Sequence, residues 1–224
     1  MTRTTTRQIN FETLKLRGAS AVVVIKLMMA ANDMSYANQN LADYKAAVER
    51  GDRNVRPNGG LYWVRLQIAH MSEAFVIINQ IRDTPDLMNF VDQCDRRTRE
   101  SFANLLPFLH GGAKHDQFRQ LVEKVRNNVA FHYQCDKLIG KTIGTLASRS
   151  GHRISTITRG DDVRLWHFQA ADVVLDTIVV RELWQVPLTR AAIDGADEAA
   201  WNTHLMFLDF MDFAGEFIWK YCET

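Results

Sequence analysis

Apolar and small residues recur at alternating intervals of three and four positions in two long stretches of this 224-residue chain. The residues of the first stretch are Phe11, Leu14, Gly18, Ala21, Ile25 and Met28. Those of the second are Leu61, Val64, Ile68, Met71, Phe75 and Ile78. This spacing places the side chains on one face of an α-helix, whereas a half-buried strand needs alternation at every second residue. We therefore expect helices at 10–33 and 61–81, packed antiparallel at a small crossing angle.

The rest of the chain adds further helical segments, and its 12 Gly and 4 Pro are few for a β-rich chain with many turns. We expect an all-α fold, a helical bundle of six to seven helices. A short hairpin is the expected exception, at 150–160, where apolar and polar residues alternate. The other expected helices begin at 84 and 116 and cover 163–185 and 197–221, with Gly140 and Gly144 ending the one that begins at 116.

Composition narrows the class of protein. Hydrophobic residues make up 46% of the chain and charged residues 24%, which excludes a disordered or fibrous protein. We expect one domain over 1–224, with a core at 10–147 and a C-terminal helical extension at 163–221. The N-terminus has no apolar signal segment, no stretch is apolar enough to span a membrane, and the three cysteines form no pattern. We therefore expect a cytoplasmic protein without a membrane partner.

Positive and negative charges nearly cancel, with 27 Lys and Arg against 26 Asp and Glu. The cancellation is between opposed segments, because residues 137–160 hold five cations and no acid, whereas 191–224 hold one cation and seven acids. This balance excludes a uniformly basic protein that coats nucleic acid, but it is compatible with a local basic binding site.

Sequence motifs of common nucleotide-binding, metalloprotease and serine hydrolase enzymes are absent. One polar set stands out beside an apolar helical stripe: Arg126, Asn127, Asn128 and His132. Arg is a permanent planar cation suited to a phosphate, and His exchanges a proton near neutral pH. Such groups can cleave an RNA backbone without a metal, since a base activates the 2′-hydroxyl and a cation stabilises the transition state. The alternative is structural: a salt-bridged surface Arg and a hydrogen-bonded His at the edge of the core.

Arg126, the polar Asn127 and, six positions after the Arg, His132 form a motif that resembles the signature of the HEPN superfamily. The resemblance covers residues 120–136 and is supported by the two long helices before it. It implies a helical bundle that dimerises about a two-fold axis, so that two Arg/His motifs form a composite site. Metal-independent endoribonucleases of toxin–antitoxin, abortive-infection and CRISPR-linked systems are frequent in this superfamily, and non-catalytic nucleotide-binding or scaffolding members also exist.

The resemblance implies a role for each residue of the motif. His132 is the expected general acid/base, Arg126 the expected contact to the scissile phosphate, and Asn127 the residue that positions one of them. The expected protein is a homodimeric endoribonuclease acting on RNA as a toxin or defence effector, with an antitoxin or defence-complex partner and with no metal or cofactor. A non-catalytic HEPN-like module that binds a nucleotide or a partner protein remains the alternative.

Two residues are expected to support the motif. Asn128 shares a helical face with His132, four positions later. Glu73 lies in an apolar stretch of the second helix and is expected to pair with Arg126 or with His132, raising the pKa of that imidazole. An exposed helical face is the alternative for Glu73.

The basic segment directly after the motif is a candidate RNA-binding surface. Its cations are Lys137, Lys141, Arg149, Arg153 and Arg159. The alternative is a solvated segment whose charges meet acids from elsewhere in the chain.

We expect structural roles for two further groups of polar residues. His110 and His115 flank a Gly-Gly pair and are more typical of turn residues than of metal ligands. Asp209, Asp212 and Glu216 follow one face of the last helix and are more typical of a solvated or partner-facing surface than of a cation site.

Overall fold

The structure is a computed structural model that describes residues 5–52, 55, 59–130, 135–148, 154–159, 161, 167–186 and 191–223, with the backbone alone for 191–200. Within these residues the chain is all-α and has no strand. Its α-helices are α1 (Phe11–Leu16), α2 (Gly18–Glu49), α3 (Gly59–Arg82), α4 (Pro85–Asp92), α5 (Arg96–Leu105), α6 (His115–Phe118), α7 (Asp136–Ser148), α8 (Gln169–Thr177) and α9 (Ala191–Tyr221). The expected all-α bundle is confirmed, with nine α-helices in the described residues instead of the six to seven expected.

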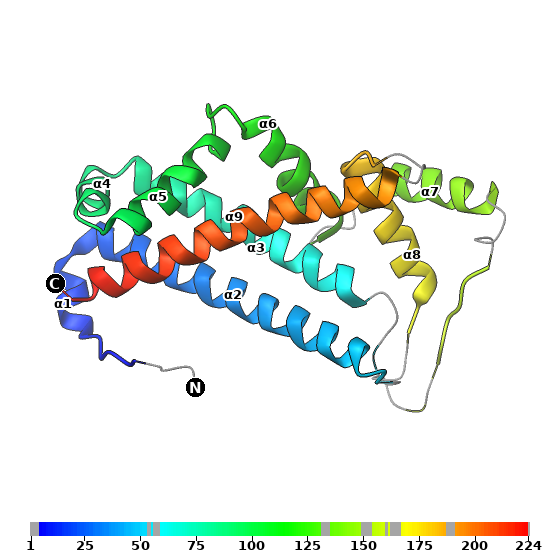
Figure 1. Ribbon diagram of the computed structural model, residues 1–224, viewed down its shortest axis with the longest axis horizontal. Helices are drawn as coiled ribbons and strands as arrows, with labels where there is room; N and C mark the ends of the chain where they lie inside the picture. The colour runs from blue at the N-terminus through cyan, green and yellow to red at the C-terminus, as the bar shows by residue number, and fades with distance from the viewer. Residues whose placement is uncertain are drawn as a thin grey trace.

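Three long helices, α2, α3 and α9, run side by side along the length of the molecule (Figure 1). α2 and α3 are antiparallel, as expected from their spacing. In α3 the expected stripe is buried at Ile68, Met71, Phe75 and Ile78. The stripe expected for the first helix is buried in part: Leu14 and Ala21 are buried, whereas Ile25 and Met28 are half-buried. Beyond Ala21, the buried positions of α2 are Val24, Leu27, Ala30, Met34, Ala37 and Leu41.

A break at Gly18 interrupts the expected first helix. Gly18 has φ +57°, a left-handed conformation that L side chains avoid, and it separates α1 from α2. α2 then continues to Glu49, well past the expected end near 33, with Met34 fully buried. Gly59 and Gly60 lie in the first turn of α3, where a Cβ on Gly59 would meet the Tyr44 ring at 2.8 Å.

Helix α9 belongs to the core. Phe210, Phe213 and Phe217 have no exposed surface and pack with Phe90, Phe102 and Tyr221 from α4, α5 and α9. One hydrophobic core thus contains residues of both expected regions, 10–147 and 163–221. The other face of α9 leaves Trp201, Leu205 and Leu208 exposed. α9 also begins at 191, six residues before the expected start.

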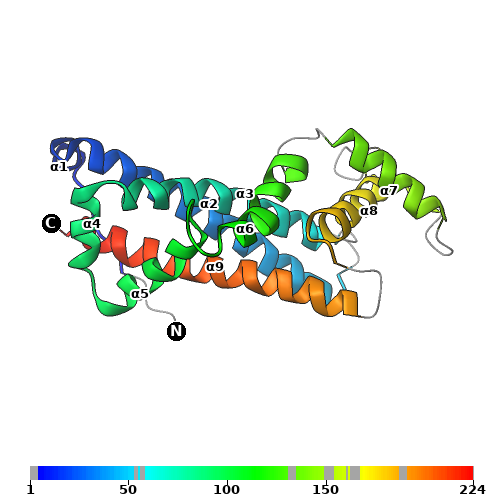
Figure 2. The same ribbon diagram turned by 90° about the horizontal axis from the view of Figure 1, so that it is seen from above.

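Helices α7 and α8 lie together at one end of the molecule, away from α1 and α4 (Figure 2). Gly140 and Gly144 do not break a helix here, because both lie inside α7 where their surroundings are open. Of the hairpin expected at 150–160, the described residues show an antiparallel bridge between Thr158 and His167, and residues 150–153 and 160 lie outside them. This bridge holds His167 extended, so α8 begins at 169 rather than at 163.

Candidate functional site

The segment that carries the sequence motif is a helix with two π-helical turns. α6 continues into η2 (Arg119–Glu123) and, after two residues, into η3 (Arg126–Ala130). The apolar stripe expected here is buried at each position: Phe118, Leu121, Val122, Val125 and Val129. The polar residues of the motif therefore lie along the edge of the core. π-Helical turns occur frequently at functional sites because they turn side chains out of the regular α-helical register.

Arg126 is held by two hydrogen bonds. Its Nη2 donates to Glu73 Oε1 at 2.8 Å, and its Nη1 donates to Asn127 Oδ1 at 2.9 Å. The Arg126 side chain is 33% exposed and that of Glu73 is 54% exposed. Arg126 is one of the two partners expected for Glu73, so this contact between α3 and η3 is present.

The remaining contacts of the motif are local. Asn128 Nδ2 donates to the main-chain carbonyl of Lys124 at 2.7 Å, within its own helix. Arg126 Nε is buried and has no hydrogen-bond partner among the described residues. His132 lies outside the described residues, together with the rest of 131–134. The site as described therefore consists of a fixed guanidinium, a carboxylate and two amides.

The basic segment is divided between two elements. Lys137 and Lys141 lie on α7 and are exposed. Lys141 Nζ forms an ion pair with Glu182 Oε2 of η5 (Ile178–Leu183) at 2.5 Å, so an acid from another segment meets this cation. Arg159 is exposed in the extended segment 154–159. Arg149 and Arg153 lie outside the described residues.

A cavity of about 290 Å³ lies within one helical turn of the Glu73–Arg126 contact. Ser72 and Val76 of α3 line it from the Glu73 side, and Glu123 lines it from the Arg126 side. Its other polar walls are Asn79, His110, His115 and Arg119. The sequence offers little signal for this cavity, because its walls come from three segments and its two histidines resemble turn residues.

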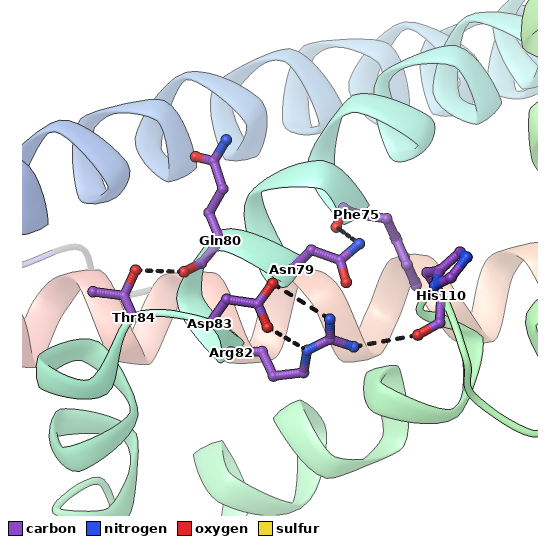
Figure 3. A network of polar contacts seen from close by, with 7 residues as sticks. All are labelled: Phe75, Asn79, Gln80, Arg82, Asp83, Thr84 and His110. Atoms are coloured by element: carbon purple, nitrogen blue, oxygen red, sulfur yellow. Dashed lines mark hydrogen bonds and ion pairs between the residues drawn. The ribbon is translucent and has the colours of Figure 1, made fainter.

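Asn79 lies at the edge of this cavity near the end of α3, close to Phe75 and His110 (Figure 3). Its Nδ2 donates to the Phe75 carbonyl at 3.2 Å, and its Oδ1 is buried without a hydrogen-bond partner in the described part of the chain. Nearby, Arg82 donates hydrogen bonds to Asp83 at 2.9 Å and to the His110 carbonyl at 3.5 Å. In the same region Thr84, expected to cap α4, instead donates its hydroxyl to the Gln80 carbonyl.

His115 is oriented by a main-chain contact. Its Nδ1 lies 3.3 Å from the Phe108 carbonyl oxygen. Because a carbonyl only accepts, Nδ1 must carry the proton, and Nε2 of the neutral ring is left as an acceptor. The His110 and His115 rings meet edge to face, with their centroids 5.4 Å apart.

A buried ion pair that the sequence did not suggest joins α3 to α8. Arg65 Nη1 lies 3.1 Å from Asp176 Oδ1, and the side chains are 8% and 17% exposed. Burial raises the pKa of Asp176 to about 6, against the lowering effect of Arg65, and Asp172 raises it further. Burial also raises the pKa of the thiols of Cys94, Cys135 and Cys222. A raised pKa leaves less of each thiol as the reactive thiolate, so the three cysteines are not activated nucleophiles.

Two acids of the α9 stripe form hydrogen bonds with residues of α5. Asn104 Nδ2 donates to Asp209 Oδ1 at 3.0 Å, and Arg97 Nη2 donates to Asp212 Oδ2 at 2.6 Å. Both contacts fix α9 against α5. In the part of the chain that the structure describes, no three His, Cys, Asp or Glu side chains are grouped to hold a metal ion.

Comparisons with protein-family models, curated proteins and solved structures find no match to this chain. Within the described residues, no helix combines the length and apolar character needed to cross a bilayer.

Proposed function

We propose that this protein is a HEPN-like, metal-independent endoribonuclease that acts as a homodimer, in the manner of a toxin or defence effector. The contact that carries the proposal is the pair of hydrogen bonds that fix Arg126 between Glu73 and Asn127. A guanidinium held at both ends, yet one-third exposed, is oriented for a phosphate before the substrate arrives.

In this proposal His132 takes the proton of the RNA 2′-hydroxyl, and the resulting oxygen attacks the adjacent phosphorus. Arg126 stabilises the negative charge that develops on the phosphate oxygens. The bond between phosphorus and the 5′-oxygen of the next nucleotide then breaks, and this oxygen leaves as a hydroxyl with the proton that His132 took up. Because the 2′-oxygen is now bonded to the phosphorus, the product carries a 2′,3′-cyclic phosphate. The partner subunit of the homodimer supplies a second copy of the Arg/His motif to the same cleft.

Single-stranded RNA incubated with the purified protein tests this proposal. We expect cleavage with 2′,3′-cyclic phosphate ends, and its loss in Arg126→Ala and His132→Ala while both variants remain dimers by light scattering. Arg99→Ala, an exposed Arg of α5, is the matched control and should retain activity. Absence of cleavage by the unmodified protein, or full activity in both variants, would falsify the proposal.

A second candidate function is a non-catalytic HEPN-like module that binds a nucleotide or a partner protein. The observation that favours it is that Glu73 already compensates the charge of Arg126. Chelators do not separate the two candidates, because neither needs a metal. Binding of RNA without any cyclic phosphate product would support the non-catalytic module.

A further inference from the structure

We propose that the cavity beside Arg126 binds a guanine base, so that the preferred RNA substrate has an unpaired guanosine near the cleaved bond. The location of the guanosine rests on the proposed function, whereas guanine binding itself does not. The argument depends on the size of the cavity, on its apolar walls and on the kind of hydrogen-bonding groups that line it.

The cavity has the size of a single base. Its volume of about 290 Å³ lies at the lower end of the range for small-molecule pockets. Phe75, Phe108 and Phe118 supply its apolar walls, with Phe75 and Phe118 stacked at 4.5 Å between centroids. Unpaired bases are recognised in RNA-binding proteins by such aromatic walls combined with polar groups that contact the base edge.

Acceptors dominate the polar groups that can contact the base. Asn79 Oδ1 is a buried acceptor that has no donor among the described residues, and the amide nitrogen is committed to the Phe75 carbonyl. His115 Nε2 is an acceptor in the neutral ring, since Nδ1 faces the Phe108 carbonyl. Glu123 adds a carboxylate to the lining of the same cavity. A buried acceptor without a donor costs free energy, and a ligand that donates to it recovers that cost.

Guanine matches this arrangement better than the other bases. Its Watson–Crick edge presents two adjacent donors, the N1–H and the 2-amino group, which a carboxylate and an amide oxygen can accept together. Adenine and cytosine present one amino group beside an acceptor, and uracil presents one N–H between two carbonyls. A good bidentate contact of this kind discriminates between bases by about tenfold or more.

Arg119 lies at the rim of the cavity and can contact the phosphate of the same nucleotide. Its side chain is 55% exposed, and its contacts to Asp116 and Glu123 are long, at 3.5 and 3.9 Å. Glu123 precedes Arg126 by one helical turn. A guanine in the cavity would therefore hold the RNA backbone close to Arg126.

Isothermal titration calorimetry of the full chain with guanosine, inosine, adenosine, cytidine and uridine 5′-monophosphates tests the proposal. We expect guanosine 5′-monophosphate to bind about tenfold more tightly than the others, including inosine 5′-monophosphate, which lacks the 2-amino group. Asn79→Leu and Glu123→Gln should each weaken this binding about tenfold. Glu49→Gln, an exposed acid at the end of α2, is the matched control.

Equal binding of all five nucleotides, or no binding, would overturn the proposal, as would unchanged affinity in Glu123→Gln. If Asn79→Leu fails to fold, Glu123→Gln decides alone, because Glu123 lies at the surface. RNA oligonucleotides with one guanosine, or inosine in its place, then distinguish a base within RNA from a free nucleotide. Cleavage without guanine preference would refute only this inference, whereas guanine binding without cleavage would refute only the ribonuclease.

Discussion

Arg126 and Glu73 meet at 2.8 Å between η3 and α3, although 53 positions separate them in the chain. Both side chains are partly exposed, so their ion pair contributes only about 0–1 kcal/mol to the free energy of unfolding. The consequence of the contact is orientation: Glu73 fixes one end of the guanidinium and Asn127 the other.

Glu73→Ala should therefore impair RNA cleavage more than folding. We expect kcat to fall about tenfold or more, because the guanidinium loses its orientation. The free energy of unfolding should change by less than about 1 kcal/mol in urea denaturation. Glu73→Gln keeps an acceptor for Nη2 and should recover part of the activity. Wild-type kcat in Glu73→Ala would show that Glu73 has no role in positioning Arg126.

Lys137 and Lys141 should contribute unequally to RNA binding, because Glu182 already neutralises Lys141. Lys137→Ala should weaken binding and reduce the slope of log affinity against log salt by about 1. Lys141→Ala should reduce this slope less. Fluorescence anisotropy with labelled RNA between low and moderate salt measures both slopes. Equal slopes for the two variants would argue against the neutralisation of Lys141.

The helical class and α3 follow from the sequence because a regular apolar spacing specifies a face. Ile68, Met71, Phe75 and Ile78 are buried as that spacing predicts. The same rule is partly right for the first helix, since Leu14 and Ala21 are buried but Ile25 and Met28 are only half-buried. It also counts Gly18 as part of one continuous helix, whereas Gly18 with φ +57° separates α1 from α2. The left-handed conformation of this one glycine does not change the spacing of the apolar residues around it, so the spacing alone does not reveal the break.

The candidate site is predicted less completely, because its residues converge from distant segments. Glu73 is recognisable as a carboxylate in an apolar stretch, and its contact with Arg126 was one of two alternatives. No sequence motif marks Asn79 or Glu123. They line the same cavity only because α3 packs against η2. The Arg65–Asp176 pair is likewise visible only after α3 and α8 are placed together.

Asp176 should give the protein a distinctive pH dependence. Its pKa rises from 3.8 to about 6 on folding, chiefly through burial, so the folded protein binds this proton more tightly than the unfolded chain. The resulting stability is fully present below pH 3.8 and is lost as the pH rises through about 6.

Asp176→Asn removes this titration. Between pH 4 and pH 7 we expect the wild type to lose about 2–3 kcal/mol of unfolding free energy relative to Asp176→Asn. Urea denaturation of both proteins across this range measures the difference. A difference that stays constant with pH would contradict the assignment to Asp176.

Two glycines should respond oppositely to substitution by alanine. Gly18→Ala should lower the free energy of unfolding by about 1–2 kcal/mol, because an L residue is strained at φ +57°. Gly140→Ala should raise it by up to about 1 kcal/mol, because Gly140 lies inside α7 with open space around it. Thermal and urea denaturation of the two variants test the pair. Stabilisation by Gly18→Ala would be inconsistent with a left-handed joint between α1 and α2.

The position of α9 in the core can be tested with two apolar residues of the same helix. Phe213 has no exposed surface and packs against Phe102 of α5, with ring centroids 4.7 Å apart. Phe213→Ala should therefore cost about 3–5 kcal/mol of unfolding free energy, from the lost burial and the cavity that remains. Leu208 is 43% exposed, and Leu208→Ala should cost less than about 1 kcal/mol. Urea denaturation gives both values. Similar small costs for the two variants would mean that α9 is an appended helix that the core does not require.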